Sequence, residues 1–360
     1  MKHRQVGLND IKVTNSDGHV IGVDLGATAV RAAILAPGML DGRPSVTVHG
    51  LGQVPLETGV IVGGAVQDPG AVTHALKKLW LEQKFECHNV ILGISGQQIS
   101  VRKHDMPNVS VEQRAKALPY QAREVIALPL DQALLDFIPL GVAQQDEETL
   151  PGLMIAAPKA PVVTAVQAVE RAGLSVARVD LSSFAVLRSI AEEQLAVEAV
   201  IDMGAQLTTV VVHNHGVPVV VRTIARGGDE LTTKLAGQAN LDLAEAEQAK
   251  RGNGLSGPDE DVNRTLLEAL RPLLAEIRAS INLFSSTNPG VLLDRIALTG
   301  GASLLRGLPE AVSDQVGLPA TVVAPLQHIR NRFTTEGESH EAIAQSASAV
   351  SVGLAMGAAA

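Results

Sequence analysis

The stretch VIGVDLGATAVRAAIL, residues 20–35, decides the fold class. Two runs of Val, Ile, Leu and Ala flank Asp24, Gly26 and Thr28, so the segment predicts a β-strand, a tight turn and a second strand. A buried carboxylate without a partner is costly. Asp24 therefore either has a cation or hydrogen-bond donors nearby, or it is an ordinary turn residue.

The same pattern returns about half a chain length later, in EAVIDMGAQLTTVVVHN, residues 198–214. Its carboxylate, Asp202, and its glycine, Gly204, occupy the places of Asp24 and Gly26. A unit of strand, carboxylate-glycine turn, strand and helices that is repeated at half length predicts two related α/β lobes. We expect the lobes to face each other, each contributing one hairpin to a shared cleft.

The composition excludes several classes of function. The 360 residues carry a formal net charge of −9 and only 2% aromatic side chains, so the chain lacks the basic field and the stacking rings that bind nucleic acid. Cys87 is the only cysteine, which rules out an internal disulfide and a thiolate metal cluster. No apolar run has the length of a bilayer span or of a signal peptide. We therefore expect a cytoplasmic protein that does not bind nucleic acid.

Each Asp-x-Gly-Ala turn suits a phosphate and a divalent cation. The glycine lets the backbone approach a ligand and leaves amide groups free to donate to phosphate oxygens. Asp24 and Asp202 would face Mg²⁺ through water, because magnesium gives up its hydration reluctantly. Thr28 and Thr208 can add hydroxyl groups. One such turn alone is an ordinary hairpin signal, but two at matching places favour a ligand site.

Two glycine pairs could line the same cleft. Gly300 and Gly301 lie between the strand pattern RIALT and a predicted helix. A flat or anionic ligand can rest on the backbone at such a turn, although a helix cap without a ligand explains the pair equally well. Gly227 and Gly228 could likewise support a ligand or cap a helix, and they could also form a hinge.

One predicted helix presents charged groups at helical spacing. Glu247, Lys250 and Arg251 share one face of the segment AEAEQAKRG. On its own, such a face is most often a solvated row of ion pairs. The sequence contains neither a Walker A pattern nor a Gly-x-Ser-x-Gly pattern.

Together, these motifs resemble those of the actin, Hsp70 and sugar-kinase ATPase superfamily. In that superfamily the two carboxylate-glycine hairpins bind phosphate, and the late Gly-Gly turn belongs to the adenosine motif. Within it, residues 19–357 are similar to the type IV pilus assembly protein PilM family, which is related to the division protein FtsA. The segments ALPLDQALLDF, residues 127–137, and DLSSFAVLRS, residues 180–189, carry the likeness to this family.

The resemblance implies a duplicated actin-like (ribonuclease H-like) α/β fold that binds ATP and Mg²⁺ between two lobes. By the same likeness, the helix that carries Glu247 reaches the ribose and the adenine. Arg31 stands where the family usually has a lysine. The implied nucleotide-binding residues are Asp24, Gly26, Ala27, Thr28, Arg31, Asp202, Gly204, Ala205, Gln206, Thr208, Gly227, Gly228, Glu247, Lys250, Arg251, Gly300, Gly301 and Ala302.

The repeat and the resemblance together give an expected organisation along the chain. The expected segments are a polar N-terminal segment, 1–18; a first lobe, 19–197, with a core of 19–50 and 151–197 and an inserted partner-binding subdomain, 51–150; a second lobe, 198–345; and a C-terminal helix, 346–360, that returns to the first lobe.

The resemblance also implies a function. It is that of a scaffold in a type IV pilus platform, peripheral at the inner face of the cell membrane, that binds the N-terminal cytoplasmic tail of a PilN-like membrane protein and other platform proteins. We expect slow or absent ATP hydrolysis, since we can name no residue that would position water. The nucleotide would then act mainly as a conformational ligand. A small-molecule kinase of the same superfamily and an FtsA-like filament protein are the alternatives.

The partner is expected at the insertion, 51–150, because insertions on a rigid scaffold commonly carry recognition. The resemblance places the tail of the PilN-like protein where this insertion meets the first lobe. Around Ile99 and Val101 the strand patterns offer backbone groups and alternating side chains to an added peptide strand. These two residues are the expected partner contacts. The alternative is that the insertion only braces the first lobe.

Overall fold

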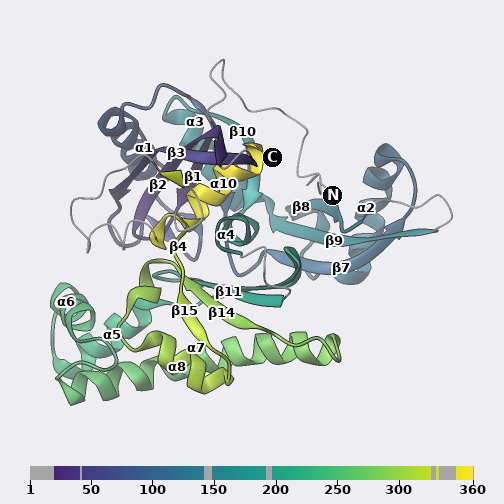
Figure 1. Cartoon of the computed structure of the whole chain (residues 1–360). Coiled ribbons are helices and arrows are strands. Elements are labelled where there is room, and N and C mark those ends of the chain that lie inside the picture. Colours follow the sequence, from purple (N-terminus) through teal and green to yellow (C-terminus); the bar gives the residue numbers. More distant parts are fainter. Residues whose placement is uncertain are drawn as a thin grey trace.

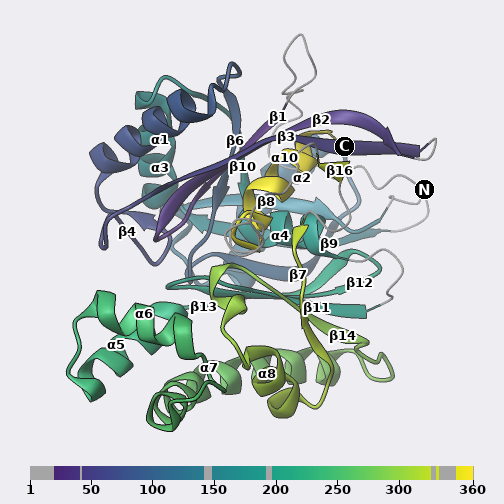
Figure 2. The same ribbon diagram turned by 60° about the vertical axis from the view of Figure 1, so that its left-hand side comes forward.

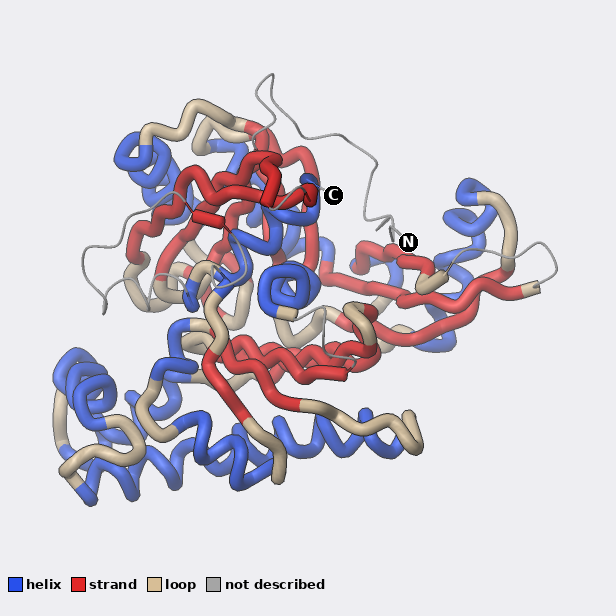
Figure 3. The backbone as a smooth tube through the Cα atoms, in the orientation of Figure 1, coloured by secondary structure: helices blue, strands red, loops and turns tan. Residues whose placement is uncertain are grey.

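The chain folds into two lobes with a smaller unit at the side of the first lobe (Figure 1). Each lobe is a β-sheet with helices packed against it, as the tube in Figure 3 shows. The computed structural model describes residues 20–40, 43–141, 148–191, 197–325, 330–331 and 346–359. The expected N-terminal segment, 1–18, lies outside the described residues.

The first lobe is built on a six-stranded sheet with the strand order β10-β6-β1-β2-β3-β16. β1 pairs antiparallel with β2 and parallel with β6, so the hairpin that carries Asp24 forms in the middle of the sheet. Apolar residues, many of them β-branched, fill β1 and β6, as is typical of strands buried on both faces. The strands are β1 (Val20–Leu25), β2 (Ala29–Leu40), β3 (Arg43–Pro55), β6 (Asn89–Ile94), β10 (Ser175–Leu181) and β16 (Arg330–Asn331).

Helices cover both faces of this sheet. α1 and α3 pack on one face, in an apolar cluster that includes residues of β1 and β6. α1 begins after Asp68, whose side chain accepts a hydrogen bond from the amide of Ala71 and so caps the helix. α4 and α10 pack on the other face. The elements are α1 (Pro69–Gln83), α3 (Lys159–Arg171), α4 (Ser182–Ile190), α10 (Ala349–Ala359) and a short hairpin of β4 (Ile61–Val62) and β5 (Ala65–Val66).

The second lobe repeats the connectivity of the first. Its sheet has the order β13-β12-β11-β14-β15, which corresponds to β3-β2-β1-β6-β10. In both sheets the first three strands form an antiparallel meander and the next two run parallel to the first. The internal repeat of the sequence is therefore a repeat of topology. The strands are β11 (Val197–Met203), β12 (Thr208–Asn214), β13 (Val217–Ile224), β14 (Arg295–Thr299) and β15 (Ala320–Val322).

The helices of the second lobe lie on the outer side of its sheet (Figure 2). α6 begins at a capping box formed by Asp242 and Glu245, as the sequence pattern indicates. α7 runs for 28 residues and buries one apolar stripe against the sheet. The helices are α5 (Gly228–Ala239), α6 (Leu243–Asn253), α7 (Glu260–Thr287) and α8 (Leu308–Val316), with a 3₁₀ turn at Gly301–Leu304.

A three-stranded antiparallel sheet, β7-β9-β8, stands beside the first lobe and carries α2 on one face. This unit does not coincide with the expected insertion, 51–150. α1 and β6 come from that range but belong to the first lobe, whereas β9 belongs to the small sheet. The elements are β7 (Ser100–Pro107), α2 (Val111–Val125), a 3₁₀ turn at Leu130–Gln132, β8 (Ala133–Pro139) and β9 (Thr149–Pro158).

α4 and α10 lie between the two large sheets and form the core that joins the lobes. Their apolar cluster includes Ala33 and Ile91 of the first lobe and Val200 and Val211 of the second. Among the described residues, no helix combines the length and the apolar character that a bilayer span needs.

Close backbone contacts seat α10 in this position. A Cβ atom on Gly22 of β1 would lie 2.1 Å from the backbone oxygen of Ser351. A Cβ atom on Gly353 would lie 1.8 Å from the backbone oxygen of Ala185 in α4. Only glycine at these two positions allows the helix to lie against β1 and α4 at this distance.

Candidate functional site

In the first hairpin, the negative charge of Asp24 is balanced by the guanidinium group of Arg31. Asp24 of β1 lies opposite Arg31 of β2, and the Asp24 Oδ2 and Arg31 Nη1 atoms are 3.6 Å apart. Arg31 also donates to Thr28 Oγ1 at 3.4 Å and to Gln53 Oε1 at 3.2 Å. A Cβ atom on Gly26 would lie 2.6 Å from Arg31 Nη1. The glycine therefore lets the guanidinium group lie over the turn, so that Asp24 has a nearby cation, the first of the alternatives that the sequence left open.

The second hairpin has the same turn but uses its hydroxyl group differently. The amide of Gly204 donates to the carbonyl of Leu207 at 2.9 Å, which closes the turn after Asp202. Thr208 is fully buried, and its Oγ1 donates to the carbonyl of Arg226 at 2.8 Å. Thr208 was expected to offer a hydroxyl group to a ligand, whereas the structure shows it bonded to the protein backbone.

The two carboxyl groups interact with each other. Burial raises the pKa of Asp202 to about 7; the negative charge of Asp24 also raises it, and Arg31 lowers it. Burial also raises the pKa of Asp24, against the opposing effect of Arg31. Two carboxylates and one nearby cation leave a net negative charge, which a divalent cation would neutralise.

The donor set fits magnesium better than a metal held wholly by protein. Among the described residues, no three or more His, Cys, Asp or Glu side chains gather as a metal site. Magnesium is commonly held by one or two carboxylates, with water and phosphate oxygens as the remaining ligands. Asp24 and Asp202, together with a bound phosphate, would complete such a set.

Both glycine turns reach the second hairpin. The amide of Gly228 donates to the carbonyl of Gly204 at 3.0 Å, and a Cβ atom on Gly227 would lie 2.4 Å from the same oxygen. Gly300 has a φ of 85°, and a Cβ atom there would lie 2.3 Å from Asp202 Oδ1. The expected glycine turns therefore converge on the hairpin that carries Asp202, where neither Gly227 nor Gly300 has room for a side chain.

The charged face of α6 lies beside the start of α5, where a Cβ atom on Gly228 would lie 3.3 Å from the Cβ atom of Ala302 and 3.4 Å from Lys250 Nζ. Lys250 is buried and donates to the carbonyl of Gly228 at 3.0 Å and to Thr232 Oγ1 at 2.8 Å. Glu247 pairs with both Lys250 and Arg251, with N–O distances of 2.6 Å. Desolvation acts to raise the pKa of Glu247, but hydrogen bonds from Lys250, Thr232 and Arg251 lower it overall. Lys250 thus already holds the α5 turn, and Arg251 is the exposed cation of this face.

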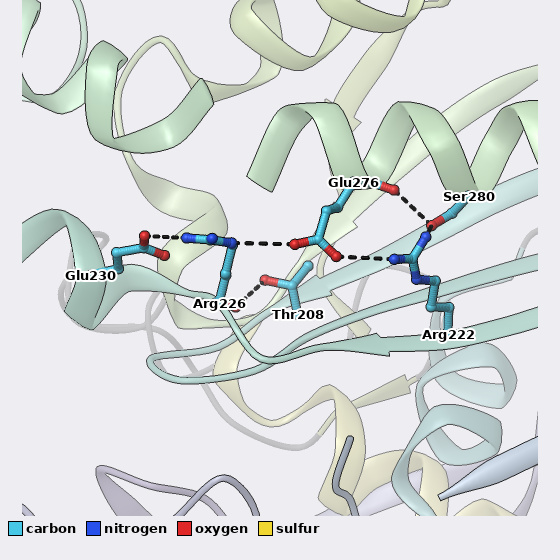
Figure 4. Close-up of polar contacts among 6 residues, drawn as sticks. All are labelled: Thr208, Arg222, Arg226, Glu230, Glu276 and Ser280. Carbon is cyan, nitrogen blue, oxygen red and sulfur yellow. Dashed lines mark hydrogen bonds and ion pairs between the residues drawn. The ribbon is translucent and has the colours of Figure 1, made fainter. Parts of the chain in front are cut away.

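A pocket of about 520 Å³ adjoins the second hairpin. Its charged lining includes Arg226, Glu230 and Glu276, which the sequence analysis did not single out. Arg226 pairs with Glu230 and donates to Glu276 Oε1 at 3.2 Å (Figure 4). Glu276 lies inside the long helix α7, far from every recognised motif, so no sequence signal pointed to it. The lining residues are Gln97, Ala205, Gln206, Ala225, Arg226, Gly227, Asp229, Glu230 and Glu276.

Gln206 makes a contact between the lobes. Its Oε1 accepts a hydrogen bond of 2.9 Å from the amide of Gly63, at the tip of the β4–β5 hairpin. Gln97, which follows β6 in the first lobe, lines the pocket beside Gln206. The tip of the second hairpin is therefore in contact with the first lobe through a residue that was expected to bind nucleotide.

Of the two expected partner contacts, Val101 is buried and Ile99 is half-buried. Val101 of β7 is 7% exposed and packs with Leu153, Ile155 and Phe184, and Ile99 packs against the same cluster. β7 is an edge strand of the small sheet, and β13 of the second lobe lies beside it. The side chain of Val101 is therefore not presented on the surface.

Comparison with known proteins gives the chain a family match. The family model described as type IV pilus assembly protein PilM matches residues 22–359. The chain is 25% identical over 274 residues to the cell division protein FtsA of Bacillus subtilis strain 168, covering 68% of this chain and 60% of that protein. It is 25% identical over 351 residues to FtsA of Neisseria meningitidis serogroup B, covering 84% of this chain and 83% of that protein.

Solved structures agree with the fold. A PilM-PilN type IV pilus biogenesis complex superposes with a TM-score of 0.82 at 26% identity, covering 97% of this chain and 100% of the other. The ethanolamine utilization protein EutJ of Carboxydothermus hydrogenoformans gives a TM-score of 0.54 at 16% identity, with 94% of this chain and 89% of EutJ covered. MreB5 of Spiroplasma citri, bound to ADP, gives a TM-score of 0.50 at 16% identity, with 93% of this chain and 94% of MreB5 covered. At this identity the last two show the actin-like fold alone.

Proposed function

The chain belongs to the type IV pilus assembly protein PilM family, and from this membership we propose that it is an ATP-binding, actin-like scaffold of a type IV pilus platform. In this proposal Mg·ATP binds between the lobes and acts mainly as a conformational ligand. The partner is the N-terminal cytoplasmic tail of a PilN-like membrane protein, which holds the scaffold at the inner face of the cell membrane. The similarity to the PilM-PilN complex supports the choice of partner.

The observation that carries the nucleotide proposal is the interacting pair Asp24 and Asp202, one from each lobe. Bound Mg²⁺ supplies the positive charge that these carboxylates lack and links them to phosphate oxygens. The turns at Gly26 and Gly204 offer backbone groups to the phosphates, and Arg31 adds a guanidinium donor. Because Asp24 and Asp202 belong to different lobes, one bound ligand would tie both lobes together.

In this proposal hydrolysis is slow. Asp24 and Asp202 face the metal, and Arg31 contacts Asp24, so these side chains serve binding and charge neutralisation. We can name no residue that would position a water molecule for attack on the phosphate. A ligand of this kind acts by binding one arrangement of the lobes more tightly than another. A turnover faster than about one per second, within the ordinary range of enzymes, would contradict this part of the proposal.

Titration calorimetry tests the nucleotide site. Asp24→Asn and Asp202→Asn should each weaken Mg·ATP binding by about tenfold or more, because each removes a charge that faces the metal. Asp261→Asn is the matched control, since Asp261 is an exposed carboxylate at the start of α7 that pairs with Arg264. Unchanged Mg·ATP affinity in both hairpin variants would refute the site.

Peptide binding tests the partner. The small sheet leaves the outer edge of β8 without a paired strand among the described residues, and a free edge is a place for an added peptide strand. A peptide that copies the tail of a PilN-like protein should bind the wild type and should bind Leu134→Glu, on β8, more weakly. Leu292→Glu, at an exposed leucine of the second lobe, should bind normally. Equal binding to both variants would remove β8 from the docking site.

A further inference from the structure

Arg226 connects the second hairpin to helix α7. It lies directly before the turn at Gly227, and its carbonyl accepts the hydrogen bond from buried Thr208 (Figure 4). Its guanidinium group is shared between Glu230 of α5 and Glu276 of α7. Backbone and side chain of one residue thus join three elements.

The turn that follows Arg226 is bonded to the hairpin tip. The amide of Gly228 donates to the carbonyl of Gly204, and the amide of Asp229 donates to the carbonyl of Ala205 at 2.8 Å. A shift of the segment after Arg226 would therefore move the backbone of the second hairpin. This hairpin carries Asp202 beside its tip.

α7 provides the fixed end of this connection. Its apolar stripe is buried over most of its length in the core of the second lobe. Glu276 accepts from Arg226 through Oε1 and from Arg222 through Oε2, at 3.2 and 3.0 Å. Both arginines therefore share one carboxylate, but only Arg226 adjoins the glycine turn.

We propose that Arg226 and Glu276 are positioning residues that hold the Gly227–Gly228 turn and the second hairpin in the arrangement that binds nucleotide. The inference rests on the proposed nucleotide site and adds two residues to it. Neither side chain needs to touch the ligand. If the ion pair already holds the turn in place, less conformational entropy is lost when the nucleotide binds, and the affinity is higher.

The experiment measures Mg·ATP affinity of Arg226→Gln, Glu276→Gln and the double variant by calorimetry. Each single change should weaken binding by about threefold to fivefold, the range expected when a partly exposed ion pair is lost. The double variant should be no weaker than the weaker single variant, because both changes break the same connection. Arg226→Lys should fall between Arg226→Gln and the wild type, since one ammonium group cannot reproduce the two-sided guanidinium contact.

Arg222→Gln is the matched control. It removes an ion pair from the same Glu276 carboxylate without touching the glycine turn, so its Mg·ATP affinity should match that of the wild type. Melting temperatures and affinity for the partner peptide should be alike for Arg222→Gln and Arg226→Gln, which separates positioning from loss of stability. Equal Mg·ATP affinity of Arg226→Gln and wild type would overturn the inference alone, as would equal weakening by Arg222→Gln. A wild type that binds no nucleotide would overturn the proposed function and the inference with it.

Discussion

Asp202→Asn should change how the stability of the protein depends on pH. The ordinary pKa of this carboxyl is 3.8 and its folded value is about 7, so the folded state holds the proton more tightly than the unfolded state. The contribution of Asp202 to stability is therefore fully present below pH 4 and is lost as the pH rises through 7. The full difference corresponds to ~4 kcal/mol, and screening at this partly buried group reduces it to ~2 kcal/mol. The Asp202→Asn variant has no titrating group at this position, so its stability does not fall with pH in this way.

Thermal unfolding of both proteins from pH 5 to pH 8.5 measures the effect. About half of the loss falls between pH 5 and pH 7, so the stability advantage of Asp202→Asn should grow by ~1 kcal/mol over this range, or about 1 to 2 °C in melting temperature, and then level off. Asp261→Asn, at the exposed start of α7, should give a curve parallel to that of the wild type. A parallel curve for Asp202→Asn would refute the reasoning, because it would mean that Asp202 titrates normally in the folded protein.

Four further changes test the packing, the backbone of one helix and one buried ion pair. Gly353→Ala should destabilise the protein by about 3 kcal/mol in chemical unfolding, because its Cβ would lie 1.8 Å from a backbone oxygen of α4; Gly237→Ala, at an open position of α5, should stabilise by about 1 kcal/mol. Pro119→Ala, inside α2, should slow amide exchange in that helix, because it restores a helical donor; unchanged exchange would contradict this. Glu198→Gln should cost about 3 kcal/mol by denaturant titration, since it leaves Arg295, bonded to buried Glu198 at 2.6 Å, without that charge; a loss under about 0.5 kcal/mol would show that the pair contributes little.

Local chemistry explains what the sequence could predict. A few adjacent residues determine each of the elements that were predicted correctly. These are the strand-turn-strand units at Asp24 and Asp202 and the capping box at Asp242. Repetition of one such unit at half the chain length was enough to predict two lobes of equal topology. The family match then supports the actin-like fold over residues 22–359.

Non-local packing explains the rest. The strands before and after Gln97 are neighbours in sequence, but β6 joins the first lobe and β7 joins the small sheet, so the boundary of the insertion could not be placed. Thr208 and Val101 have residue types suited to a ligand or a peptide, but tertiary packing buries both. Arg226 meets Glu276 only because β13 lies against α7. Long-range contacts of this kind leave no pattern in a single sequence.

The position of α10 gives the protein an order of assembly. β1 and β2 are the first described strands to leave the ribosome, but the helix that lies against them is synthesised after every strand of both sheets. Until then, the apolar faces that meet around α10 have no cover. A chain that is still being synthesised would therefore expose apolar surface that chaperones and proteases recognise. A chain truncated just before Ala349 would leave the faces that α10 covers exposed, and we expect it to aggregate or to be degraded more readily than the full-length chain.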